Sequence, residues 1–137
     1  MGNVFADITL RNCGDVINVQ RGIITEEDIR TLSLTALVDT GAMTLVINED
    51  VCRRLGLTTV GTRSVCLAGG TEAFCKTTEP VQICWKDRIT TVHAWVLPGG
   101  DETLLGVIPL EDMDLIVDPA RNELIGAHGD RVMGRLK

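Results

Sequence analysis

Residues 37–42 read Leu37-Val-Asp-Thr-Gly-Ala42, and this stretch decides how the rest of the chain is interpreted. An aliphatic strand ends at a single carboxylate, which is followed by a small hydroxyl residue and a glycine. Gly41 permits a tight turn and lets its backbone N–H approach the Asp39 carboxylate. Taken alone, such a tripeptide is most often an ordinary Asx turn at the end of a strand. The flanking sequence therefore has to decide between a turn and a reactive carboxylate.

The sequence before Asp39 is typical of strands. Thr31 to Val38 alternates, and its apolar residues share one face: Leu32, Leu34, Ala36 and Val38. Val4 to Leu10 predicts a further strand, and Val16 to Val19 with Ile23-Ile24 predicts a second extended piece. Residues 25–28 look like a capped helical start, but we expect only a loop or a single turn there.

The sequence after Asp39 predicts one clear helix and several hairpins. Asn48 is a good N-cap, and Gly56 stands where the helix would end in a left-handed residue. Two strands joined at Gly69-Gly70 form a strong hairpin signal, followed by strands at 81–85 and 89–97. Pro109 to Met113 predicts a short helix with proline at its start, and 115–125 a last hairpin. The chain is therefore predicted to be mostly β with two short helices.

Composition indicates one soluble domain that spans residues 1–137. The 137 residues are 45% hydrophobic but only 3% aromatic, so the core has to be aliphatic. Thirteen basic residues against nineteen acidic ones give a net charge of −6 and no basic patch, which argues against nucleic acid as a partner. There is no apolar run long enough for a membrane helix and no secretory signal, so we expect a cytoplasmic protein without a membrane partner.

The five cysteines are odd in number and include no CxxC pair, which indicates reduced and mostly buried thiols. Cys66, Cys75, Cys84 and His93 recur every nine residues, and three cysteines with one histidine are a possible zinc set. Structural zinc sites usually take their ligands in close pairs, so we interpret this spacing as a repeat of strand lengths and expect no metal. His93 lies in an apolar strand and is interpreted as a sheet residue rather than a base.

From Leu32 to Ile125 the chain resembles the retropepsin-like (clan AA) aspartic proteases, in particular the small bacterial homologues of the retroviral enzymes. The resemblance rests on the order of residues 37–42, Leu45-Val-Ile47, Arg54-Leu-Gly-Leu57, the Gly-Gly hairpin and Leu104-Leu-Gly106. It implies a mainly β, closed barrel-like acid-protease fold with one or two short helices, active as a C2 homodimer. The tail, residues 127–137, lies outside the resemblance.

By this resemblance Asp39 is the catalytic aspartate, Thr40 supports the interlocking of two active-site loops, and Gly41 shapes the loop. The hairpin around 68–71 is the flap, and Leu105-Gly106 braces the loop. Substrate contacts are expected at Ala42, Met43, Ala68, Gly69, Gly70, Leu105 and Gly106, and no cofactor is implied. Four further apolar residues either line pockets or belong to the core: Leu45, Val46, Ile47 and Ile108.

Aspartic proteolysis needs two carboxylates that share one proton and one water, whereas this sequence has a single Asp-Thr-Gly. A catalytic site would therefore require Asp39 from each of two protomers. We expect a homodimeric aspartic endopeptidase that takes extended peptides. A noncatalytic dimer that binds peptides or partners is the alternative, because Met43 stands where relatives carry serine or aspartate, and Gly70 where they often carry aspartate.

Overall fold

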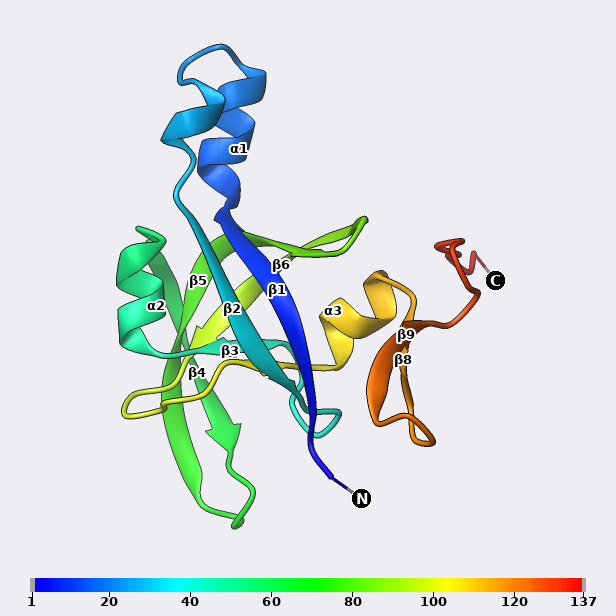
Figure 1. Cartoon of the computed structure of the whole chain (residues 1–137). Coiled ribbons are helices and arrows are strands. Elements are labelled where there is room, and N and C mark those ends of the chain that lie inside the picture. Colours follow the sequence, from blue (N-terminus) through cyan, green and yellow to red (C-terminus); the bar gives the residue numbers. More distant parts are fainter. Residues whose placement is uncertain (1, 137) are drawn as a thin grey trace.

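Strands dominate the chain, as predicted. The computed structural model describes residues 2–136, and Figure 1 shows their arrangement. The strands are β1 (Val4–Asn12), β2 (Thr31–Val38), β3 (Leu45–Ile47), β4 (Thr59–Cys66), β5 (Glu72–Trp85), β6 (Arg88–Val96), β7 (Leu104–Leu105), β8 (Leu115–Asp118) and β9 (Glu123–Gly126). The helices are α1 (Cys13–Gln20), the 3-10 turn η1 (Glu26–Asp28), α2 (Glu49–Arg54) and α3 (Val107–Asp112).

Seven of the strands form one sheet that bends into a ring. Their order is β1-β2-β7-β3-β6-β5-β4, and an additional pairing of β1 with β5 closes the ring and leaves β4 at its edge. Inside lies an aliphatic core whose most buried members include Leu10, Leu45, Ile47, Ile83 and Leu105. β8 and β9 pair separately as a two-stranded sheet. The mainly β fold expected for a retropepsin-like chain is therefore present.

β2 carries the face that its alternation predicts. Ala36 is fully buried, and Leu32, Leu34 and Val38 pack against the core from partly buried positions. β1 pairs with β2 along its whole length, from Val4 opposite Val38 to Arg11 opposite Thr31. β2 therefore delivers the chain to Asp39 from a fixed register.

α2 forms where the capping residues predict it. The Asn48 side chain accepts a hydrogen bond from the Val51 N–H at 2.8 Å, and Gly56 takes a φ of +61° just after the helix. Val51 and Leu55 face the core, with 8% and 0% of their surface exposed. The helix thus follows the predicted pattern of caps and buried residues.

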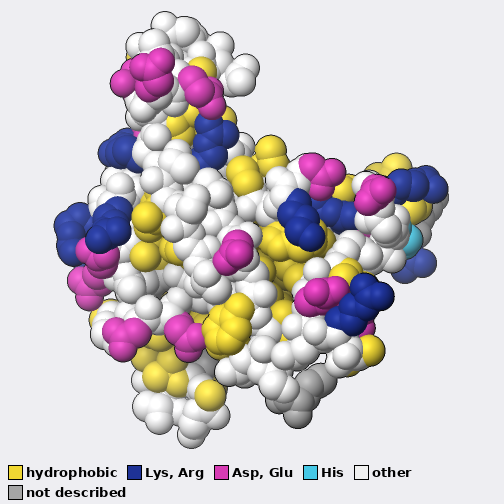
Figure 2. Space-filling model, viewed as in Figure 1, with side chains coloured by type: hydrophobic (Ala, Val, Ile, Leu, Met, Phe, Trp, Pro, Cys, Tyr) yellow, Lys and Arg dark blue, Asp and Glu magenta, His cyan; other side chains and the backbone are white. Residues whose placement is uncertain are grey.

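The second extended piece expected at Val16 to Val19 is instead the helix α1, so the chain has three α-helices rather than one or two in the described part. β-branched residues favour strands, but here the Asn12 side chain caps the helix by accepting from the Asp15 N–H at 3.1 Å. Residues 13–30, called the lobe below, project from the ring (Figure 1). Acidic side chains gather at the lobe's far end, over η1 (Figure 2).

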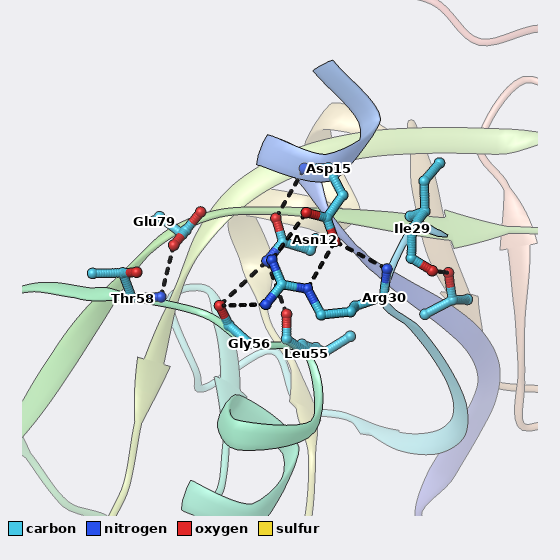
Figure 3. A network of polar contacts seen from close by, with 9 residues as sticks. Asn12, Asp15, Ile29, Arg30, Leu55, Gly56, Thr58 and Glu79 are labelled. Carbon is cyan, nitrogen blue, oxygen red and sulfur yellow. Dashed lines mark hydrogen bonds and ion pairs between the residues drawn. The ribbon is translucent and has the colours of Figure 1, made fainter. Parts of the chain in front are cut away.

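A polar network fastens the lobe to the end of α2 (Figure 3). The Arg30 guanidinium donates to both Asp15 carboxylate oxygens at 2.9 Å, and the buried Asn12 amide donates to the Leu55 carbonyl at 2.8 Å. Any side chain at Gly56 would collide with the Arg30 guanidinium. The hydrogen bonds from Arg30 lower the pKa of the Asp15 carboxyl, although burial acts in the opposite direction.

The later hairpins are confirmed with two changes of boundary. The strands predicted near 71–75 and 81–85 are parts of one long strand, β5, which bends at register shifts on both of its neighbours. α3 begins at Val107 with Gly106 as its N-cap, so Pro109 is its third residue rather than its first. β8 and β9 form the predicted last hairpin. Among residues 2–136, no helix is long and apolar enough to span a bilayer.

The tail, which lies outside the resemblance, folds back onto the segment between α3 and β8. The buried Arg88 guanidinium donates to the carbonyl oxygens of Met113 at 2.8 Å, Asp114 at 2.9 Å and Gly129. The Asp114 carboxylate binds His128 at 2.7 Å, and these hydrogen bonds hold the Asp114 pKa below its usual range. The body of the molecule therefore extends beyond the last hairpin.

Candidate active site

Asp39 is the first residue after β2, in a loop whose backbone is held on both sides. Its N–H donates to the Leu105 carbonyl at 3.0 Å, and its own carbonyl accepts from the Ala42 N–H at 3.1 Å. The carboxylate oxygen Oδ1 accepts from the Gly41 N–H at 2.8 Å. This is the close backbone approach that the glycine was predicted to allow.

Besides that N–H, the Asp39 carboxylate has no polar partner among residues 2–136. It lies partly buried, and Thr40 and Gly41 beside it are exposed. Within residues 2–136, Asp39 forms no ion pair, and its side chain makes no other hydrogen bond. One carboxylate oxygen therefore stays available to accept or donate a proton, which is what acid–base chemistry requires.

Leu105 and Gly106 brace the Asp39 loop. β7 lies between two strands, with Leu105 opposite Val38 in the parallel pair and opposite Leu45 in the antiparallel pair. The N–H of Val107 then donates to the Ala42 carbonyl at 2.9 Å, and that of Ile108 to the Met43 carbonyl at 2.8 Å. Ala42, Met43, Leu105 and Gly106 therefore lie together with Asp39, as the sequence analysis expects.

Gly106 has a steric reason to be glycine. A Cβ atom at this position would collide with the backbone carbonyl oxygens of Thr44 and Ala42. The backbone at Gly106, between β7 and α3, thus passes against the loop more closely than any side chain would permit.

The hairpin tip at Ala68, Gly69 and Gly70 is built as a tight turn. The Leu67 N–H donates to the Thr71 carbonyl at 2.8 Å, and Gly70 takes a φ of +83°. All three tip residues are exposed. No hydrogen bond within the described chain joins this turn to residues 39–44, so in a single chain the hairpin is not bound to the Asp39 loop.

The sequence left open whether four apolar residues line pockets or belong to the core, and the structure divides them between the two: Leu45, Val46, Ile47 and Ile108. Leu45 and Ile47 are fully buried and belong to the core, whereas Val46 is partly buried. Ile108 is 47% exposed, and its N–H donates to the carbonyl of Met43, which is 50% exposed. Of the four, Ile108 has the exposure and the position that a contact near Asp39 requires.

Phe5 is a residue of this surface that the sequence analysis missed. It lies on β1, opposite Leu37 of β2, which is two residues before Asp39. Its surface is 53% exposed. We use the name apolar rim for three exposed apolar residues on segments that adjoin the Asp39 loop, namely Phe5, Met43 and Ile108. The available signal was the rarity of aromatic residues, because the chain has only two phenylalanines and this one lies in a predicted strand.

The cysteines with nine-residue spacing are not gathered into a metal site in the part of the chain that the structure describes. Cys66 is exposed at the end of β4, whereas Cys75 and Cys84 lie on β5, where burial raises the pKa of both thiols. His93 is exposed on β6, and its Nδ1 lies 2.7 Å from the Thr78 carbonyl oxygen. Only Cys52 and Cys75 are fully buried thiols, fewer than the composition suggested.

Comparison with known proteins gives one family. Residues 25–112 match the family described as "gag-polyprotein putative aspartyl protease", which covers β2 with Asp39, the hairpin, β7 and α3. A comparison with curated proteins found no match.

Proposed function

Because the chain belongs to the retropepsin-like aspartyl protease family, we propose that it is an aspartic endopeptidase that is active as a homodimer. Asp39 of each protomer would supply one carboxylate of the catalytic dyad. The observation that carries the proposal is the Asp39 loop itself. Its carboxylate is held by the Gly41 N–H, lacks an ion-pair partner in residues 2–136, and rests on the brace of Leu105 and Gly106.

The chemistry follows from bringing two such carboxylates together. Two carboxyl groups within hydrogen-bond distance of each other cannot both be ionised, because their negative charges repel. The pair therefore holds one proton across its working pH range. The ionised carboxylate takes a proton from a water, which attacks the scissile carbonyl. The protonated carboxyl donates to the carbonyl oxygen, which gives a tetrahedral diol. When the diol collapses, this carboxyl recovers its proton, the C–N bond breaks, and the leaving amine receives the proton that the other carboxyl took from water. The Gly41 N–H, fixed on Oδ1, orients each carboxylate for this exchange.

Two features support the dimer. The chain has a single Asp-Thr-Gly, so one protomer holds half of a dyad. The apolar rim lies on segments that adjoin that half-site, and each of its three side chains is about half exposed. Apolar side chains that surround a polar centre are typical of surfaces that another protein covers. Burying the rim against a second copy would also remove bulk water from the carboxylates.

The proposed substrate is an extended peptide. Its backbone would pair with the edge of the hairpin, and alternate side chains would enter pockets on either side. The exposed tip at Ala68 to Gly70 is free of hydrogen bonds to the Asp39 loop in the single chain, as a closing flap requires. Ala42 and Met43 would contact the peptide next to Asp39.

Met43 supports the second candidate, a noncatalytic peptide-binding dimer. Its exposed thioether presents an apolar surface where relatives carry a polar residue. An apolar surface can bind a peptide side chain, but it cannot orient the peptide backbone through hydrogen bonds. The two candidates differ in one respect, which is whether the Asp39 carboxylate is needed for more than binding.

Cleavage of a mixed peptide library between pH 4 and 7 tests the proposal. Wild type is compared with Asp39→Asn and with Asp50→Asn, an exposed carboxylate on α2 that serves as the matched control. We expect products from wild type and Asp50→Asn only, with specific activity falling on dilution as dimers dissociate. Equal cleavage by Asp39→Asn would overturn the role of Asp39. Peptide binding without cleavage by wild type would favour the binding module.

A further inference from the structure

A cavity of about 500 Å³ lies away from Asp39, between α2 and the base of the β4–β5 hairpin. Cys52 on α2 and Cys75 on β5 form part of its floor, and both side chains are buried. Burial raises the pKa of both thiols, so the floor is uncharged and apolar at neutral pH. Cavities of this size with apolar floors are typical of small-molecule sites.

The cavity is separate from the proposed cleavage site. Asp39 does not line it, and the chain runs from the Asp39 loop through the whole of β3 before it reaches Glu49 at the cavity. The four residue-to-residue steps from Thr44 through β3 to Asn48 span about 13 Å. A molecule bound in the cavity would therefore leave the carboxylate free.

Opposite charges stand on opposite walls of this cavity. Glu49 lines it from the first turn of α2, and Lys76 lines it from β5. Neither residue forms an ion pair within residues 2–136, whereas Arg53, also on the α2 wall, is paired with Asp50 at 3.0 Å. The cavity therefore offers one unpaired anion, one unpaired cation and an apolar floor between them.

An aromatic side chain stands at the same site. Phe74 lines the cavity from β5 and is 71% exposed, although the chain has only four aromatic residues. Its register partner on β4 is Ser64, three residues beyond the β-bulge between Thr59 and Gly61 at the hairpin base. Exposed aromatic surface and β-bulges both concentrate at binding sites.

We propose that this cavity binds a short apolar peptide with free termini, of two or three residues, in which Glu49 holds the ammonium group, Lys76 holds the carboxylate, and apolar side chains pack over Cys52 and Cys75. Such a peptide is a zwitterion, so its two charged termini match the opposite charges on the two walls. A fatty acid or an apolar amine would match the charge on one wall only. A bound peptide would link α2 to the hairpin base. The proposal is independent of cleavage by Asp39.

The test is a nuclear magnetic resonance titration of the backbone amides with Leu-Leu, N-acetyl-Leu-Leu and Leu-Leu-amide. It uses wild type and Asp39→Asn, so that hydrolysis of the probe is excluded in one of them. We expect Leu-Leu to shift the amides of residues 49–53 and 74–76 saturably. Blocking either terminus should weaken binding about tenfold, since each terminus makes a charge-assisted hydrogen bond.

Variants assign the two charges. In Lys76→Gln, Leu-Leu and Leu-Leu-amide should bind equally, and in Glu49→Gln, Leu-Leu and its N-acetyl form should bind equally. Lys86→Gln, in the turn just beyond the other end of β5, is the matched control and should behave as wild type. Absence of saturable shifts, or equal binding of all three probes to wild type, would overturn the proposal. Loss of cleavage with these results intact would bear on Asp39 alone.

Discussion

Asp15 and Asp39 lie just beyond opposite ends of the same pair of strands, and their surroundings have little in common. β1 and β2 are antiparallel, so the residues after Asn12 and after Val38 leave the pair in opposite directions. Asp15 is one-tenth exposed and receives three hydrogen bonds from Arg30, whereas Asp39 receives one from a glycine N–H. The comparison indicates that Asp15 stabilises the fold, while Asp39 has the free carboxylate oxygen that the proposed chemistry needs.

Exchange of each carboxylate for its amide gives the largest expected contrast. Asp39→Asn should reduce cleavage at least about 1000-fold, because an amide cannot take the proton from water. Its unfolding midpoint should stay close to that of wild type, since an amide oxygen still accepts from the Gly41 N–H. Peptide cleavage and thermal unfolding measure the two effects. A large loss of stability in Asp39→Asn would show that this carboxylate is structural as well.

Gly106→Ala sharpens the comparison by moving the loop without touching its carboxylate. A methyl group would press on the Thr44 and Ala42 carbonyls, so we expect a loss of about 1–3 kcal/mol in the free energy of unfolding. Displacement of the loop should lower cleavage by about 100-fold. Chemical denaturation and kcat/KM provide the measurements.

Gly134→Ala is the control for that substitution, because a methyl group there meets no atom within 4 Å and the residue lies in the exposed tail. It should leave both cleavage and stability unchanged. If Gly106→Ala behaves in the same way, the brace does not position Asp39.

The strands were predictable because alternation is local, and β2 carries its apolar residues on the predicted face. α1 was not predicted, because its β-branched residues favour a strand and outweighed the local cap at Asn12. The bonds from Arg30 to Asp15 that hold the helix join residues fifteen positions apart, which no local pattern reveals. Asp39 stood out in the sequence through its motif. The contact that makes Gly106 necessary joins segments more than sixty residues apart, so spacing alone does not predict it. The position of Phe5 beside the Asp39 loop could not be predicted without knowing the register of β1 against β2.

Asp15→Asn should affect stability and spare cleavage. We expect a loss of about 1–2 kcal/mol at neutral pH, since the bonds are charge-assisted but Arg30 is half exposed to water. The pKa of Asp15 is lowered in the folded protein, so its contribution is present above the unfolded value near 3.8 and is lost as pH falls through the folded pKa.

The stability difference between wild type and Asp15→Asn should therefore be constant from pH 7 to 5 and shrink below pH 4. Urea unfolding across this range measures it. A difference that grows on acidification would contradict the assignment of Asp15 as an ionised partner of Arg30.

Asp50 has two cationic partners, but it is expected to contribute less to stability than Asp15, because it is more than half exposed. It lies 3.0 Å from Arg53 and 3.1 Å from Arg54, and all three side chains are more than half exposed. Water screens such pairs, so Asp50→Asn should lower the free energy of unfolding by only about 0.5 kcal/mol, including the loss of a negative charge in the first turn of α2. In 1 M salt this difference should vanish, whereas that of Asp15→Asn should persist in large part. Equal salt sensitivity of the two variants would mean that partner number, rather than burial, sets the strength of these carboxylate bonds.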